Sequence, residues 1–232
     1  NSALDANTSG ARNVAIGYET LGANTEGSDN TAIGYDALSS NTTANNNTAV
    51  GNDALRENTT GGNNTALGES TLTNNTTADR NTGVGYGALY ANTTGSRNTA
   101  VGNNSLLSNT TGLRNVAVGD GALQLGTSIQ YNTAVGYAAL YNNTAGNNTA
   151  VGYAALLSNT SGSNNVALGS EALDANTTGS NGTALGYQAL TNSTGSSNTG
   201  VGAEALLSNT SGYQNTALGS DALRSNTTGN NN

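Results

Sequence analysis

The sequence contains no Cys, His, Phe, Trp, Met or Pro. Without the large aromatic side chains and Met, a thick globular core cannot be filled. The absence of Cys excludes disulfides and thiolate metal sites. Without His and Cys, the usual pairs of nucleophile and base are missing. We therefore predict a protein with a thin core that is not an enzyme and holds no cofactor or metal.

Charge is also scarce, since only 9% of the residues are charged and the net charge is −8. An acidic chain with six Arg and no Lys is a poor partner for phosphate backbones or anionic membranes. No apolar run approaches the length needed to cross a bilayer. We expect neither nucleic acid binding nor membrane insertion.

What the sequence does contain is a tandem repeat, which has to be recognised before any fold is assigned. Segments such as Asn132-Thr-Ala-Val-Gly136 recur every 17 residues, with two units of 16. The repeat glycines, numbered position 0 of each unit, are residues 17, 34, 51, 68, 85, 102, 119, 136, 152, 169, 186, 202 and 219. Residues 1–232 are thus predicted to form a single repeat array, a segment of a longer fibre.

A 17-residue unit is too short for a helix pair and suits one coil of short strands and turns. The predicted fold is all-β, a parallel β-solenoid of about 13 coils stacked roughly 4.8 Å apart. Two columns of residues are predicted to form its core, an aliphatic column at position −1 and a leucine column at position +4. Representative members of this core ladder are Val50, Val101, Val135, Val151, Leu38, Leu55, Leu140 and Leu156.

Two further columns carry structural information. Position −2 is always Ala or Gly, as in Ala134 and Gly200, and strand alternation points it away from the aliphatic column. These small residues either lie at tight corners inside one coil or let the backbone of another chain approach. Position −4 is Asn in every unit except that of Gly182, which is typical of stacked amide ladders inside a solenoid.

The segments Arg12-Asn-Val-Ala-Ile-Gly17-Tyr and Asn165-Val-Ala-Leu-Gly169-Ser resemble the repeats in the heads of trimeric autotransporter adhesins. The longer Asn-Thr-Ala-Val-Gly-Tyr-x-Ala-Leu form is similar to repeats of phage-type tail-fibre and bacterial surface proteins. The resemblance covers essentially the whole chain and implies a left-handed β-roll that assembles as a homotrimer. The unit here is two or three residues longer than in the adhesin heads.

Two columns of charged residues are candidate ligand sites. Glu19, Asp36 and Asp53 share position +2 on adjacent coils, where a solvated, mutually repulsive face is favoured over a loose Ca²⁺ site. Arg80, Arg97 and Arg114 share position −5, which the sequence alone assigns to surface charge.

Two further columns are candidates for contact with a partner or for modification. A discontinuous tyrosine stripe at position +1 could stack against a sugar or a partner, namely Tyr18, Tyr35, Tyr86, Tyr137, Tyr153 and Tyr187. Asn-x-Ser/Thr sequons recur in the turns and make candidate glycosylation sites, among them Asn41, Asn58, Asn92, Asn109, Asn176 and Asn226.

These patterns favour an extracellular, cell-surface or virion-surface fibre segment, a rigid stalk or head whose main partner is itself, as a homotrimer or a head-to-tail filament. One alternative is an ice-binding protein, because Thr recurs at positions −3, +8 and +9. Another is a surface module that binds a host-surface glycan or protein.

Overall fold

The computed structural model describes residues 3–232 and confirms a parallel β-solenoid of about 12 turns built on the 17-residue repeat. Each repeat contributes one three-residue strand, which begins with Thr or Val and ends with an aliphatic residue before the repeat glycine. The strands are β1 (Val14–Ile16), β2 (Thr31–Ile33), β3 (Thr48–Val50), β4 (Thr65–Leu67), β5 (Thr82–Val84), β6 (Thr99–Val101), β7 (Val116–Val118), β8 (Thr133–Val135), β9 (Thr149–Val151), β10 (Val166–Leu168), β11 (Thr183–Leu185), β12 (Thr199–Val201) and β13 (Thr216–Leu218).

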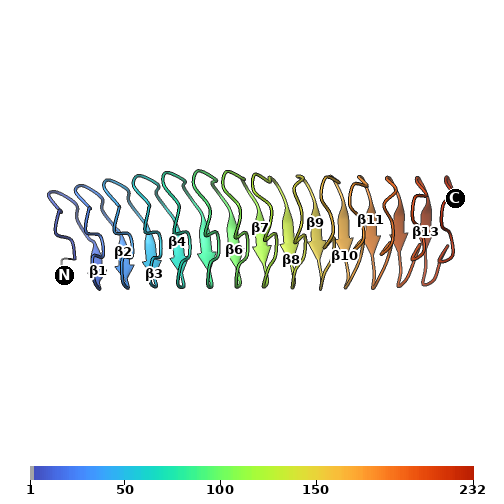
Figure 1. The fold of residues 1–232 in the computed structure, drawn as a ribbon, viewed down its shortest axis with the longest axis horizontal. Coiled ribbons are helices and arrows are strands. Elements are labelled where there is room, and N and C mark those ends of the chain that lie inside the picture. The colour runs from blue at the N-terminus through green and yellow to red at the C-terminus, as the bar shows by residue number, and fades with distance from the viewer. Residues whose placement is uncertain (1–2) are drawn as a thin grey trace. The chain divides into compact units, whose positions relative to one another are not determined.

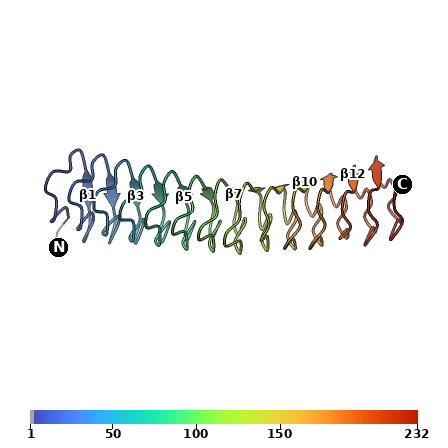
Figure 2. The ribbon, with the colours of Figure 1, turned by 90° about the horizontal axis from the view of Figure 1, so that it is seen from above.

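The chain divides into two compact units, Asn1–Asn115 with β1 to β6 and Val116–Asn232 with β7 to β13. Within each unit, neighbouring strands lie side by side in chain order, as both views show (Figures 1 and 2). Within each unit, every strand residue pairs with its equivalent in the next coil, for example Ala32 with Ala49 and Ala134 with Ala150. Whether the two units form one continuous array stays a prediction.

The leucine column lies in the interior, as predicted. Leu38, Leu55, Leu140 and Leu156 are all 0% exposed. A ladder of fully buried leucines one coil apart therefore forms the main apolar column inside each unit.

The prediction for the aliphatic column is wrong. Val50, Val101 and Val135 are partly exposed and Val151 is 37% exposed, whereas the Ala at position −2 in their strands is fully buried. The strands alternate as expected, but the small residue faces inward and the larger residue outward. This also decides between the two interpretations of the small column, because the alanines lie inside one coil.

The narrow interior explains this inversion. A Cβ atom added to Gly83, which takes the place of Ala at position −2, would lie 2.5 Å from Thr71 Cγ2 and 3.5 Å from Leu72 Cδ1. At Gly200 the same atom would lie 3.1 Å from Leu190 Cγ. Side chains of the preceding coil, Thr71 at Gly83 and Leu190 at Gly200, already fill the space, so position −2 accepts only Ala or Gly.

The inversion predicts opposite responses at two adjacent residues. Ala134→Val should destabilise the protein by about 1–3 kcal/mol or more, because the added methyl groups overpack the interior. Val135→Ala should cost the isolated chain less than about 1 kcal/mol, because its side chain is already partly in water. Urea unfolding followed by circular dichroism compares the two, and a larger loss for Val135→Ala would show that the valines form the core.

Two columns of buried Asn complete the interior, the first at position −4 and the second at position +7. Asn47 is typical of the first column: its Oδ1 accepts from the Asn64 N–H at 2.9 Å and its Nδ2 donates to the Gly61 carbonyl at 2.9 Å. In the second column, which Gly126 and Ser193 interrupt, Nδ2 of an Asn donates to Oδ1 of the Asn one coil earlier, as from Asn41 to Asn24 at 2.8 Å. Asn209 donates instead to Ser193 Oγ. The amides satisfy turn backbone that would otherwise be buried without partners.

Left-handed backbone recurs at fixed positions of each coil. The repeat glycines have φ between +119° and +141°, and the leucine column has φ between +49° and +57°. Only Gly adopts the first region readily, and β-branched residues are disfavoured in the second. This explains why position +4 is Leu throughout while the aliphatic column exchanges Val, Ile and Leu.

Candidate functional site

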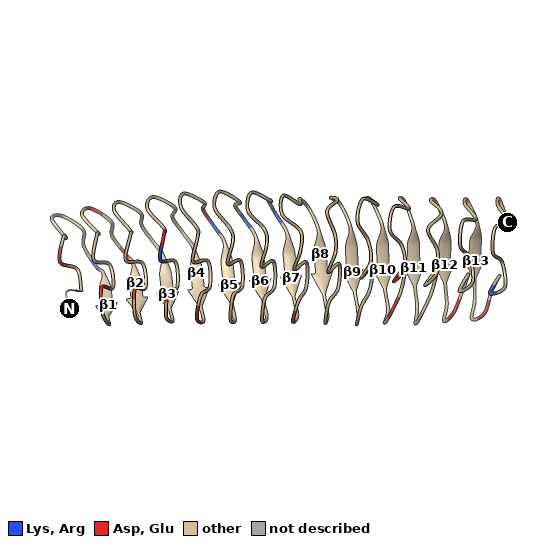
Figure 3. Cartoon of the chain, viewed as in Figure 1, with Lys and Arg blue, Asp and Glu red and all other residues tan. Residues whose placement is uncertain are grey.

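The outward side chains of the strands form the most distinctive surface of the protein, here called the sheet face. It consists of the aliphatic column at position −1 and a mostly threonine column at position −3. None of the strands in residues 3–232 contains a charged residue, and the strands are tan in Figure 3. Exposure reaches 38% for Leu67 and 39% for Leu168 inside their units. Each unit thus presents an uncharged apolar strip edged by hydroxyl groups.

The threonine columns considered for ice binding fall into different environments. Ten of the thirteen strands begin with Thr, which places that column on the sheet face. At position +8, by contrast, the hydroxyl groups donate to the backbone of the next coil, as from Thr25 Oγ1 to the Thr42 carbonyl at 3.1 Å. The threonines at position +9, such as Thr43, Thr60 and Thr94, are exposed as well, but they lie in the turns. On the sheet face, the hydroxyl row comes from the strand threonines.

The tyrosine stripe at position +1 is exposed, with 40% to 56% of each residue accessible in Tyr18, Tyr35, Tyr86, Tyr137, Tyr153 and Tyr187. Neighbouring rings stack where two coils in succession carry Tyr. The centroids of Tyr18 and Tyr35 are 5.0 Å apart, and those of Tyr137 and Tyr153 are 5.3 Å apart. What these rings contact outside the chain stays a prediction.

Two open clefts occur where a second Tyr stands at position +5 and position +2 is Gly or Ala. The cleft in the first unit measures about 650 Å³ and is lined by Tyr86, Gly87, Tyr90, Asn104, Leu107 and Ser108. The cleft in the second unit measures about 380 Å³ and is lined by Tyr137, Ala138, Tyr141, Asn142, Tyr153 and Leu157. Exposed Tyr faces beside amide groups suit stacking on the apolar face of a sugar ring.

The glycosylation hypothesis is wrong for the buried sequons. Asn41, Asn58, Asn92 and Asn109 are 0% exposed and Asn176 is 1% exposed. The Nδ2 atom that would carry a glycan donates to the second asparagine column and to a turn carbonyl. Asn226 is less buried, but its Nδ2 also donates, to Asn209 Oδ1 at 2.9 Å and to the Gly229 carbonyl at 3.1 Å. The regular spacing of the sequons therefore follows from the second asparagine column, whose side chains stabilise the interior.

Within the acidic column at position +2, Asp36 lies between two like charges. Burial raises the pKa of Asp36, and the carboxylates of Glu19 and Asp53 on the adjacent coils raise it further. The described residues contain no cluster of three or more potential metal-binding acids.

This raised pKa predicts a pH-dependent effect at Asp36. Its folded pKa exceeds the unfolded value of about 3.9, so its charged form opposes folding, and that opposition disappears as the pH falls through the folded pKa. Asp36→Asn should therefore raise the thermal midpoint at pH 7, with a difference from wild type that shrinks toward pH 3.

Asp29→Asn is the matched control, because Arg12 lowers the pKa of Asp29. It should instead lower the midpoint at pH 7, again with a difference that vanishes in acid. Thermal melts across this pH range measure both variants, and parallel curves for Asp36→Asn and wild type would contradict the assignment.

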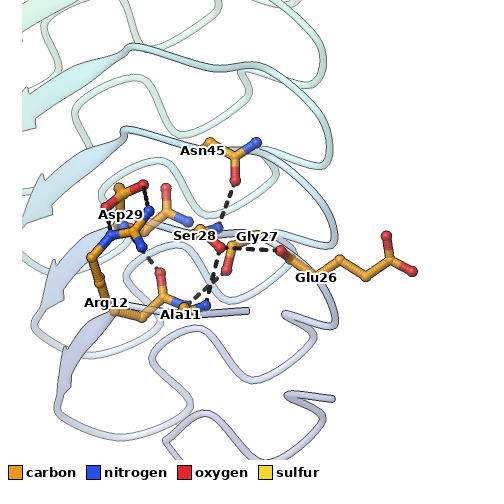
Figure 4. A network of polar contacts seen from close by, with 9 residues as sticks. Ala11, Arg12, Glu26, Gly27, Ser28, Asp29 and Asn45 are labelled. Carbon is orange, nitrogen blue, oxygen red and sulfur yellow. Dashed lines mark hydrogen bonds and ion pairs between the residues drawn. The ribbon is translucent and has the colours of Figure 1, made fainter. Parts of the chain in front are cut away.

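Arg12, Arg56 and Arg224 form ion pairs with nearby acids. Arg12 holds Asp29 of the next coil through two bonds, of 2.5 and 2.7 Å, in the network drawn in Figure 4. Arg56 pairs with Asp53 and Glu57, and Arg224 pairs with Glu204 and Asp221.

Comparison with known proteins adds no functional assignment. Within residues 3–232, no helix is long and apolar enough to cross a membrane. No family model matches the chain, and neither curated proteins nor solved structures gave a match.

Proposed function

We propose that this chain is a structural segment of an extracellular, cell-surface or virion-surface fibre whose copies associate side by side through the sheet face. The proposal gives it no catalytic role. The observation that supports it is the uncharged strip of aliphatic side chains left open to water in both units. Contiguous exposed apolar patches of this kind mark interaction surfaces in soluble proteins.

A second copy of the same chain is the occupant that best fits this strip. A partner can follow the strip over many coils only if its own side chains repeat at the coil spacing of about 4.8 Å. A second copy of this chain has the same coil spacing because it has the same repeat. The net charge of −8 opposes association, but the charges lie outside the strands, so two or three sheet faces can meet without burying a carboxylate.

Substitution of one aliphatic residue by an acid tests the proposal. Val50→Asp should weaken association at least a hundredfold, because each copy would bury an unpaired carboxylate. Thr60→Asp carries the same charge on an exposed turn and should leave association unchanged. Light scattering over a concentration series measures the mass, and circular dichroism verifies the fold. A wild-type chain that stays monomeric at all concentrations would contradict the proposal.

Ice binding is a second candidate for the same face, favoured by the row of strand threonines. The two functions are separable, because ice binding needs a free face on the purified chain, whereas self-association covers it. Thermal hysteresis from a monomeric chain would replace the fibre proposal with ice binding.

Glycan binding is compatible with the fibre proposal and is supported by the two tyrosine clefts. In that case the solenoid serves as a scaffold and the clefts supply adhesion.

A further inference from the structure

Three arginines on successive coils of the first unit form a surface feature, the arginine row, that the fibre proposal does not use. Arg80, Arg97 and Arg114 occupy position −5, each in left-handed backbone, with φ values of +59°, +62° and +57°. All three are exposed, and they appear as three successive blue segments in Figure 3. Half of the positive charge of the chain therefore lies on three neighbouring coils.

The coils are held together at this row by backbone hydrogen bonds. The Arg97 N–H donates to the Asp79 carbonyl at 3.1 Å, and the Arg114 N–H donates to the Ser96 carbonyl at 3.2 Å. The three side chains thus leave the backbone at the coil spacing, within about 10 Å of one another. They line a pocket of about 270 Å³ together with Asp79, Ser96 and Leu113.

Neither Arg80 nor Arg97 forms an ion pair within the described part of the chain. Arg12, in the same column, shows the contrast, because Asp29 follows it one coil later and binds its guanidinium. Asp79 forms no such pair with either arginine, and its Oδ1 accepts from the Gly62 N–H at 2.7 Å. Like charges one coil apart repel, and an anion between them would relieve the repulsion.

We propose that the arginine row binds a tetrahedral oxyanion, a sulfate or phosphate group, in this pocket. Guanidinium groups present paired N–H donors that match the oxygen spacing of such groups. The surrounding acidic chain disfavours an extended polyanion, so the ligand is a single group whose charge is confined to these three coils. The site does not depend on the sheet face and stands or falls separately from the fibre proposal.

Titration of the full chain with inorganic phosphate and inorganic sulfate, followed by the arginine Nε–H signals in NMR spectra, tests the site. Saturable shifts are expected for both ions and not for chloride at equal ionic strength. Titrations with a sugar 6-phosphate and a sugar 6-sulfate then identify the source of the group. Tighter binding of the esters than of the inorganic ions indicates a sugar ester as the ligand, and weaker binding indicates a free ion. Shifts that fail to saturate, or that chloride reproduces, would overturn the proposal.

The repeat supplies matched variants. Arg97→Asp recreates the natural order of Arg12 and Asp29 and should weaken binding at least tenfold, while Asp29 shows that the backbone position accepts Asp. Arg12→Gln should leave binding unchanged. Asp79→Asn should tighten binding severalfold and keep the coil contact, because Asn45 accepts the Ser28 N–H in the same column. Unchanged affinity in Arg97→Asp, or loss in Asp79→Asn with the circular dichroism spectrum intact, would contradict the site.

Discussion

Gly51→Ala is expected to lower the free energy of unfolding by more than about 3 kcal/mol and to disrupt the coils around it. Gly51 has φ of +139°, a conformation that a residue with a Cβ atom adopts only under strain. The added Cβ would also lie 2.5 Å from the carbonyl oxygen of Gly68 and 2.6 Å from its carbonyl carbon. Both atoms belong to the backbone of the next coil, so the clash cannot be relieved by a side-chain rotation.

Gly219→Ala separates the two causes. Gly219 has a similar φ of +119°, but nothing lies within 4 Å of its added Cβ. It should therefore show the backbone strain without the clash and cost less than Gly51→Ala. The midpoints of urea unfolding, followed by circular dichroism, measure the difference. Equal losses of unfolding free energy in the two variants would show that the close contact between repeat glycines of neighbouring coils does not exclude a side chain at this position.

Asn47→Ala is expected to destabilise the protein by about 2–3 kcal/mol. The Asn47 side chain is fully buried and provides the acceptor for the Asn64 N–H. Its removal leaves that buried donor without a partner, whereas the Gly61 carbonyl keeps its bond from Asn58 Nδ2 at 2.9 Å. Asn52→Ala, at an exposed position, should change stability by less than about 0.5 kcal/mol.

The one interruption of the first asparagine column supplies the reverse experiment. Gly182 donates its N–H to Asn165 Oδ1 at 2.8 Å but has no side-chain oxygen for the next coil. The added Cβ would lie 3.3 Å from Leu173 Cδ1, so that flexible side chain must shift slightly. Gly182→Asn should then raise stability, by up to about 1 kcal/mol, by providing an acceptor for the Asn198 N–H. The same urea titration detects the gain. A loss in this variant together with no loss in Asn47→Ala would disprove the role of the ladder.

The sequence predicted the coil length, the parallel stack, the buried leucine column and the asparagine ladder at position −4. It did not predict which side of the strand faces inward, because hydrophobicity alone assigns the larger Val135 to the core and the smaller Ala134 to the outside. The range of side-chain sizes found in each column does distinguish the two sides. Position −2 never exceeds Ala in size, whereas position −1 varies among Val, Ile and Leu, as an open surface allows.

The polar columns show a similar limit. The amino-acid sequence of the sequon Asn58-Thr-Thr does not show whether its amide group is exposed or buried. Only the stacking of coils in the structure shows that Asn58 Nδ2 is hydrogen-bonded inside the coil. The arginine row was visible in the sequence as a column. That Arg80 and Arg97 form no ion pair in residues 3–232 depends on which acidic residues the fold brings close to them. The spacing of residues in the sequence does not predict those neighbours.

The hydrogen bonds described above join a coil only to itself or to the coil on either side. Excising or duplicating a whole repeat therefore leaves each remaining residue with an equivalent neighbour above and below. Genetic recombination between repeats can therefore lengthen or shorten such a protein. Each event adds or removes one coil and leaves the contacts of the remaining residues nearly unchanged.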